Sequence, residues 1–394
     1  MVQDLHLTSR PLLLVEGGPL FHLEKRTGLI RENAPLKKQR ALLAALLTWL
    51  PLFALSAFQG HAFGHSVQVP FLRDFGVYTR FLLAVPLLIL AENLLGPRIA
   101  EAAAHFVESG VVQERDFPQF DAIVERQLQL RNSALAEVII AILAYVFTMI
   151  GFKITAVHAT TWYATPTDHG AVFTWAGWWL ILFCTPLFQF LGFRWLWRLF
   201  LWFQFLGRVR KLDLQLYPTH GDGAGGLGFV GETQRFFGIL LFAFSIASAG
   251  VLANSIIYDK VPLESFAPAI AVYVVITLIV LTAPLLLFAG TLLKTKRKGL
   301  NEYGTLSTKY SGEFHRKWIL REDPSREPLL GTGDIQSLAD LGNSYALVQK
   351  MKAIPIELRT ILHLIVACLL PLVPLLLTVM PLKEILKLLM KVLM

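Results

Sequence analysis

The sequence predicts an all-α polytopic integral membrane protein of about seven transmembrane helices with a helical cytoplasmic layer. Hydrophobic residues make up 55% of the 394 residues and charged residues only 16%, whereas a soluble domain carries about a quarter charged residues. The mean hydropathy is +0.55, and apolar runs of about twenty residues, long enough to cross a bilayer, recur along the chain. The net charge of +8 comes from Lys and Arg clustered beside these runs, which indicates the lipid bilayer, and no nucleic acid, as the partner.

Residues 1–40 form the predicted cytoplasmic N-terminal arm. Its basic end, with Lys37, Lys38 and Arg40, directly precedes the first apolar run. Positive charge beside a first span places the start of that span in the cytoplasm. A cleavable signal would have a short basic start and a small-residue cleavage site, so this run is interpreted as a retained span.

Residues 41–293 are predicted to contain transmembrane helices one to six, with cytoplasmic segments at 96–133 and 208–235. The spans cover about 41–58, 77–95, 134–156, 171–191, 236–257 and 269–293. The fourth apolar block continues to residue 207, which exceeds the roughly twenty residues needed to cross. It is expected to continue past Arg194 as an interfacial or cytoplasmic helix, and a separate crossing by 193–207 is the alternative.

Residues 294–357 are predicted to be a cytoplasmic helical segment. Apolar residues recur at three- and four-residue spacing from Leu300 to Trp318, which is typical of one helix with an apolar stripe. Pro324 and Pro328 are expected to end this helix, and Asp334 is expected to cap a second helix that follows.

Residues 358–394 hold the last predicted transmembrane helix and an amphipathic C-terminal helix. The span covers about 360–380 and is expected to be interrupted at Pro371 and Pro374. The basic helix 381–394 either lies in the membrane interface or re-enters, so the number of crossings is open by one.

Glycine accumulates most densely in residues 217–229. Gly221, Gly223 and Gly226 have the spacing of a dinucleotide-binding fingerprint, but that fingerprint needs a preceding strand, and here an aromatic membrane helix precedes it. A tight turn that packs backbone closely between helices is the favoured interpretation. The alternative is a loop that binds a polar ligand through exposed backbone N–H groups. Its candidate binding residues are His220, Asp222, Gly223 and Gly226.

Four charged residues lie near the cytoplasmic ends of the predicted spans: Glu92, Glu137, Arg194 and Arg198. An isolated charge costs about 2–3 kcal/mol at the centre of a membrane helix. At least one carboxylate is therefore predicted to pair with one of the arginines. A structural pair is favoured over an ion gate because the cost of a charge is smaller near the interface.

The sequence predicts no catalytic residue, no cofactor and no metal site. It contains no nucleophile elbow, HExxH or kinase signature, so an enzyme is the less favoured class. Histidines of the predicted outer loops would need a fixed third ligand to hold a metal. These histidines are His61, His65, His158 and His169.

Residues 220–229, 301–304 and 334–344 carry a likeness to other proteins. They resemble a family of uncharacterised bacterial multi-pass inner-membrane proteins, and the glycine-rich run is the most specific part. The likeness spans most of the chain. It implies a bacterial inner (plasma) membrane location and brings no activity with it.

The leading functional hypothesis is a membrane channel or transporter for an unidentified ion or small solute, in a homo-oligomer. Its basis is the set of polar residues near spans and the prolines within them, because a proline can loosen a span where neighbours or water satisfy the freed carbonyl groups. One alternative is a membrane-embedded enzyme or lipid- or ligand-binding protein that uses the glycine-rich loop. The other is a membrane scaffold whose cytoplasmic segments recruit a partner.

Overall fold

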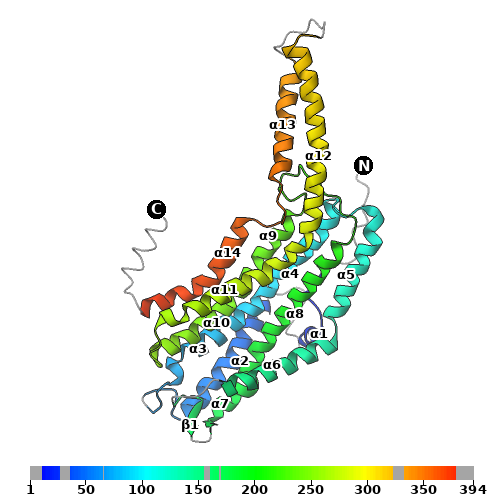
Figure 1. Ribbon diagram of the computed structural model, residues 1–394. Coiled ribbons are helices and arrows are strands. Elements are labelled where there is room, and N and C mark those ends of the chain that lie inside the picture. The colour runs from blue at the N-terminus through cyan, green and yellow to red at the C-terminus, as the bar shows by residue number, and fades with distance from the viewer. Residues whose placement is uncertain are drawn as a thin grey trace.

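The computed structural model describes residues 11–26, 36–64, 66–154, 160–167, 170–322 and 332–378. They form a bundle of helices with one short antiparallel sheet (Figure 1). The predicted helical class is confirmed. The sheet, made of β1 (Ala164–Thr167) and β2 (Gly170–Phe173), is a departure from the prediction.

The helices follow one another along the chain with short connections. They are α1 (Pro19–Arg26), α2 (Leu36–Phe58), α3 (Phe75–Val77), α4 (Val85–Glu108), α5 (Phe117–Arg131), α6 (Ala134–Ile154), α7 (Trp175–Trp179), α8 (Thr185–Val209), α9 (Gly228–Phe236), α10 (Gly238–Ile257), α11 (Ala267–Thr282), α12 (Ala289–Phe314), α13 (Asp334–Lys350) and α14 (Leu358–Leu369). Wider, π-helical turns extend three of the helices: η2 (Tyr78–Ala84), η4 (Leu180–Cys184) and η7 (His315–Ile319).

Seven helical stretches are long and apolar enough to cross a membrane, which agrees with the predicted number. They are Lys38–Phe58, Phe75–Glu108, Ala134–Lys153, Trp175–Val209, Gly228–Ile257, Leu263–Ile319 and Leu358–Thr378. Several run beyond the predicted spans. The second continues through Pro97 to Glu108, and the fourth continues unbroken past Arg194 to Val209, as expected.

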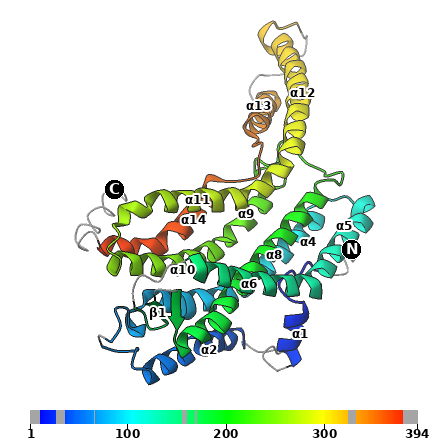
Figure 2. The same cartoon turned by 60° about the horizontal axis from the view of Figure 1, so that its bottom comes forward.

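The bundle has two different ends. One end carries α1, α5 and the base of a projecting hairpin of α12 and α13, which lie towards the right of Figure 2. The opposite end carries the two strands, at the left of the same view and at the bottom of Figure 1. We call them the hairpin end and the sheet end.

The hairpin confirms the two predicted helices but not the predicted cap. The residue that precedes α13 at its N-cap is Gly333, and its side chain cannot cap. The Asp334 carboxylate instead accepts hydrogen bonds from Trp318 Nε1 at 2.9 Å and Lys317 Nζ at 3.0 Å. Asp334 therefore joins the end of the first helix to the start of the second.

The last apolar stretch changes its helix type part of the way along. The predicted break in the last span is present, because α14 ends at Leu369 and residues Leu370–Thr378, with Pro371 and Pro374, form a 3₁₀ helix. Pro324, Pro328 and the amphipathic helix 381–394 lie outside the described residues.

The core lies where α4 and α8 face their neighbours, and much of the outer surface is apolar. Phe106, Trp195 and Trp202 are almost completely buried. On α6 and α11 the outward side chains are aliphatic, for example Ile142, 56% exposed, and Ile279, 59% exposed. A belt of exposed aliphatic side chains of this kind needs an apolar surrounding or a partner.

Gly250 lets α10 lie directly against the segment α3–η2. A Cβ added at Gly250 would lie 1.9 Å from Thr79 Oγ1 and 2.7 Å from the backbone oxygen of Phe75. We expect Gly250→Ala to lower the free energy of unfolding by about 1–3 kcal/mol, as overpacking does. Thermal unfolding in detergent would measure the loss. Gly290→Ala on α12 is the matched control, because a Cβ there meets nothing within 4 Å; an equal loss in both variants would contradict the close approach.

Candidate functional site

A cavity of about 400 Å³ lies near the sheet end, between the second, third, fourth and fifth of the long helical stretches. η2 contributes Arg80 and Phe81, the start of α8 contributes Thr185 and Gln189, and α10 contributes Asn254. The segment that leads into β1 closes one side. The cavity is therefore built from elements far apart in the sequence.

Three buried polar atoms at this cavity have no hydrogen-bond partner among the described residues. They are Arg80 Nε, Thr185 Oγ1 and Gln189 Oε1. Buried polar groups in proteins are nearly always paired, and an unpaired one costs about 1–3 kcal/mol. The clustering of three such atoms at a single cavity indicates a place for polar guests, either water or a solute.

Arg80 supplies positive charge to a cavity whose lining also includes the carboxylates of Asp74 and Asp259. Its guanidinium carbon lies 5.7 Å from the ring centroid of Phe188 and 6.0 Å from that of Phe81. None of the ion pairs among the described residues includes Arg80. Contact with ring faces at this distance only partly offsets the loss of hydration of a cation, so the guanidinium can accept an anionic group.

Asp74 also borders the cavity, but its carboxylate is already occupied. It accepts hydrogen bonds from Trp162 Nε1 and Asn254 Nδ2, both at 2.7 Å, and from the Val77 backbone N–H at 3.3 Å. Asp74 is 6% exposed. It fixes the loop before α3, the segment before β1 and α10 to one another, and thereby holds the wall that faces Arg80. Asn254 of α10 also accepts a hydrogen bond from the Phe75 N–H of α3 at 3.0 Å, and so joins the two helices.

Tyr163 adds a hydroxyl to the cavity wall. Burial, and next the charge of Asp74, raises the pKa of Tyr163. The phenol therefore stays protonated at physiological pH and remains a hydrogen-bond donor. A protonated phenol and a guanidinium together offer hydrogen-bond donors to an anionic or strongly polar molecule.

Both π-helical turns at the cavity have the same origin in the sequence. η2 ends two residues before Pro86, and η4 ends two residues before Pro186. A proline has no N–H to donate and its ring collides with the carbonyl group four residues earlier, so the turn before it widens. The Val85 N–H bonds to the carbonyl of Arg80, five residues back, and the Thr185 N–H bonds to that of Leu180. Single π turns of this kind are frequent at functional sites.

The predicted carboxylate–arginine pair forms nearer the hairpin end, and the prediction is confirmed. Glu92 Oε1 lies 2.9 Å from Arg198 Nη1 and 3.7 Å from Arg194 Nη1, and Glu92 Oε2 lies 3.3 Å from Arg40 Nη1. None of these four side chains is more than 9% exposed. The burial of the group favours the structural role over an ion gate.

Glu137 is not part of this group. Its Oε2 accepts a hydrogen bond from the Leu20 backbone N–H at 2.9 Å, at the first turn of α1, and Asn132 accepts one from the Gly18 N–H at 3.0 Å. Arg198 Nη2 donates to the Val15 carbonyl group at 3.1 Å. Glu137 and Arg198 thus hold the N-terminal arm against the bundle.

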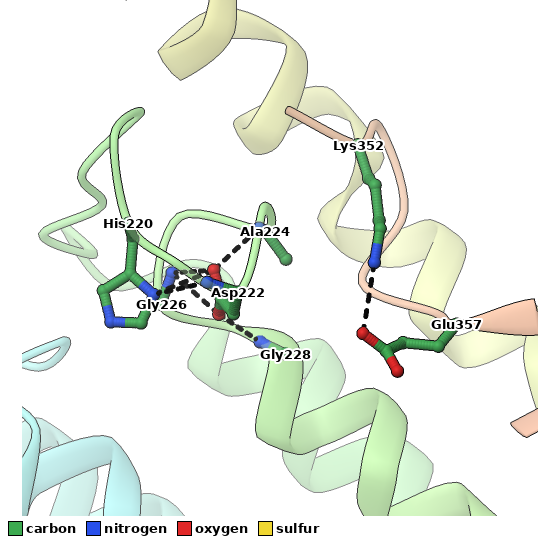
Figure 3. A network of polar contacts seen from close by, with 7 residues as sticks. All are labelled: His220, Asp222, Ala224, Gly226, Gly228, Lys352 and Glu357. Atoms are coloured by element: carbon green, nitrogen blue, oxygen red, sulfur yellow. Dashed lines mark hydrogen bonds and ion pairs between the residues drawn. The ribbon is translucent and has the colours of Figure 1, made fainter. Parts of the chain in front are cut away.

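The glycine-rich loop is organised by its own aspartate (Figure 3). The Asp222 carboxylate accepts hydrogen bonds from the backbone N–H groups of Ala224 at 2.7 Å, Gly228 at 2.8 Å and Gly226 at 3.1 Å. His220 Nδ1 lies 2.9 Å from Asp222 Oδ1. These N–H groups are the ones that would bind an external anion, so their occupation by Asp222 favours the tight-turn interpretation over the ligand-binding one.

The same loop clamps the base of the hairpin. The Gly223 carbonyl group accepts a hydrogen bond from the Lys352 N–H at 2.7 Å, and Lys352 pairs with Glu357 at 3.3 Å beside it (Figure 3). Gly223 and Gly226 have φ values of 63° and 100°, which glycine adopts most readily. The candidate residues of the loop therefore connect α8, α9 and the end of α13.

A smaller cavity of about 230 Å³ beside the loop is lined by His105, His220, Asp222 and Glu357, among others. The described residues contain no group of three or more His, Cys, Asp or Glu that could hold a metal ion. His65, His158 and His169 lie outside the described residues. Cys184 and Cys368 are buried free thiols.

Sequence reasoning did not identify Arg80 or Asp74 as site residues. A signal was present, because Arg80 is an arginine near the start of an apolar stretch, where a charge is costly and usually functional. Its neighbours Thr185 and Gln189, more than a hundred positions away, could be assigned to the same site only from the packing of the helices.

No protein-family model matches the chain, and comparisons with curated proteins and with solved structures find no match.

Proposed function

We propose that this chain is a multi-pass membrane protein that transports a small solute bearing an anionic group, and that the cavity at the sheet end is its binding site. The seven apolar stretches and the exposed aliphatic belt support insertion in a bilayer. The observation that carries the transport proposal is Arg80, a cation without an ion-pair partner among the described residues, beside a cavity with two further unpartnered polar groups.

The distribution of basic residues supports an orientation with the hairpin end and the N-terminus in the cytoplasm. The described loop residues at the sheet end, 59–64, 66–74, 160–167, 170–174 and 258–266, contain two basic residues, Arg73 and Lys260. The segment 208–211 and the segment 294–298 at the hairpin end contain seven. Positive charge concentrates on the cytoplasmic side of membrane proteins. The likeness of the glycine-rich run adds the bacterial inner membrane to this proposal.

A gated transporter agrees with the packing better than an open channel. Along α4, Val85 and Leu88 separate Arg80 from Glu92, and both are fully buried. On α8, Trp195 is 2% exposed and donates a hydrogen bond from Nε1 to the Leu88 carbonyl group at 2.8 Å. This apolar layer closes the cavity towards the hairpin end, so passage of a solute requires the layer to open.

Arg80→Gln should weaken anion binding at least tenfold, because a charge-assisted hydrogen bond contributes about 1.5–3 kcal/mol. The probes are chloride, inorganic phosphate, acetate and succinate, each tested for thermal stabilisation of the purified protein in detergent. The anion that stabilises it is then followed in uptake by proteoliposomes. Arg98→Gln is the matched control, since Arg98 lies on α4, is 47% exposed and forms its ion pair with Glu101 on the surface, away from the cavity. Equal binding by the two variants, or no response of the wild type to any anion, would refute the proposal.

A further inference from the structure

A groove between α5 and α8 at the hairpin end has the composition of a binding site for a phosphate-bearing group. Its cavity of about 640 Å³ is lined by α5 and by the end of α8 with the residues just after it: Gln119, Ala122, Ile123, Gln204, Gly207, Arg208, Lys211 and Leu212. The cations on its wall are Arg208 and Lys211, and the described residues that line it include no carboxylate. The groove therefore has an uncompensated positive charge.

The arginine in the groove lacks a partner. Arg208 Nε is buried without a hydrogen-bond partner, and no ion pair among the described residues includes Arg208 or Lys211. Gln204 is engaged on one side only, where its Oε1 accepts a hydrogen bond from Gln127 Nε2 at 3.1 Å. Its amide N–H groups have no partner among the described residues, so two cations and one amide donor converge on the groove.

An apolar strip continues from the groove along the same face of α8. Phe193, Trp197 and Phe200 precede Gln204 at intervals of four, three and four residues, the spacing of one helical face. Trp197 stacks on Phe200 at 5.4 Å between ring centroids, and Phe200 is 50% exposed. Cations thus stand at the end of the helix, and from them extends an aromatic strip that is exposed at Phe200 and packs against Phe147 of α6 at Phe193.

We infer that this groove binds the headgroup of an anionic phospholipid, with the acyl chains lying along the aromatic strip. The lipid phosphate would accept hydrogen bonds from Arg208 and Lys211. The strip beyond the Gln204 amide is apolar, so it suits the acyl chains. A free phosphate ion would use the cations but would leave the strip without a function. Basic residues at the cytoplasmic ends of spans attract anionic lipids by about 1 kcal/mol each. A groove in addition fixes the place at which the lipid binds.

The lipid site rests on the proposed insertion in a membrane but not on the cavity that contains Arg80. The experiment is native mass spectrometry of the full-length protein in detergent, with phosphatidylglycerol or phosphatidylcholine of identical acyl chains, and with inorganic phosphate as competitor. We expect the wild type to retain phosphatidylglycerol at least fivefold better than phosphatidylcholine. The Arg80→Gln protein should retain it equally well, which separates this site from the transport proposal.

Two variants and one control variant test the groove itself. The double variant Arg208→Gln, Lys211→Gln should lose the preference for phosphatidylglycerol, whereas Arg297→Gln, Lys298→Gln, with the same loss of charge at exposed positions of α12, should keep it. Ala122→Glu places a carboxylate on an exposed wall of the groove and should reduce retention without disturbing the core. Equal retention of both lipids by the wild type, equal loss in the α12 variant, unchanged retention by Ala122→Glu, or complete displacement by inorganic phosphate would each overturn the lipid assignment.

Discussion

Replacement of Glu92 by alanine is expected to lower the free energy of unfolding by about 3–5 kcal/mol, the usual loss when one partner is removed from a buried ion pair. Glu92 lies within 4 Å of Arg40, Arg194 and Arg198. Without it, buried guanidinium groups face one another with no carboxylate between them. Chemical unfolding in mixed micelles, followed by circular dichroism, would measure the loss.

Two control variants show whether the loss is specific to the buried Glu92 carboxylate. Glu101→Ala removes a carboxylate from the same helix, but Glu101 is 63% exposed in its pair with Arg98, and a surface pair contributes less than about 1 kcal/mol. Arg194→Gln should also cost less than about 1 kcal/mol, because Arg194 is the more distant of the two α8 partners and its removal relieves repulsion with Arg198. A loss for Glu92→Ala no larger than for Glu101→Ala would show that the buried group contributes little.

Asp222→Ala is expected to cost about 3 kcal/mol, because it leaves three backbone N–H groups of the loop without their acceptor. The first effect should be local. Amide hydrogen exchange should become faster in residues 217–229 and at Lys352, whose N–H bonds to Gly223. The control is Asp213→Ala, since the Asp213 side chain is 74% exposed in its contact with Arg115. Unchanged exchange in the loop would contradict the role assigned to Asp222.

The same carboxylate makes the loop sensitive to acid. Burial by itself would raise the pKa of Asp222, but the hydrogen bonds from Ala224, Gly228, His220 and Gly226 outweigh it and hold the pKa below its usual value. A carboxyl group with a lowered folded-state pKa stabilises the fold above its unfolded pKa of about 3.9, and this stability is lost as the pH falls towards the folded-state pKa. Protection of the loop should therefore be constant near neutral pH and decline below about pH 4, and the Asp222→Ala protein should lack this decline.

The features predictable from the sequence are those that depend on composition and local spacing. The apolar runs are long enough to identify seven helices, and Pro371 and Pro374 mark the end of α14 because proline cannot continue an α-helix. Arg194 and Arg198 lie on one helical face near the depth of Glu92, and this spacing was sufficient to predict their pairing. Each of these inferences depends only on the sequence of a single helix, or on charged residues that lie at the same depth in the membrane.

The features that escaped prediction depend on contacts between distant segments. The cap expected at Asp334 is absent because Trp318 and Lys317, brought close by the hairpin, offer better donors to its carboxylate. β1 and β2 have four residues each and β1 contains Pro166, so neither strand is long enough to show a clear periodicity in the sequence. The cavity joins Arg80 to Thr185 and Gln189, and no local spacing relates these residues to one another.

The two π turns at the cavity, η2 and η4, each contain one residue more than the α-helical turn that they replace. Deletion of a single residue within Tyr78–Ala84 would restore ordinary α-helical bonding and leave the flanking helix in place, while side chains inside the turn, Arg80 among them, would point in another direction. Arg80 would then turn away from Thr185 and Gln189 while Glu92 kept its arginine partners. Relatives of this chain that bind a different solute could thus differ from it by the gain or loss of one residue near Pro86 or Pro186, with every other contact of the bundle retained.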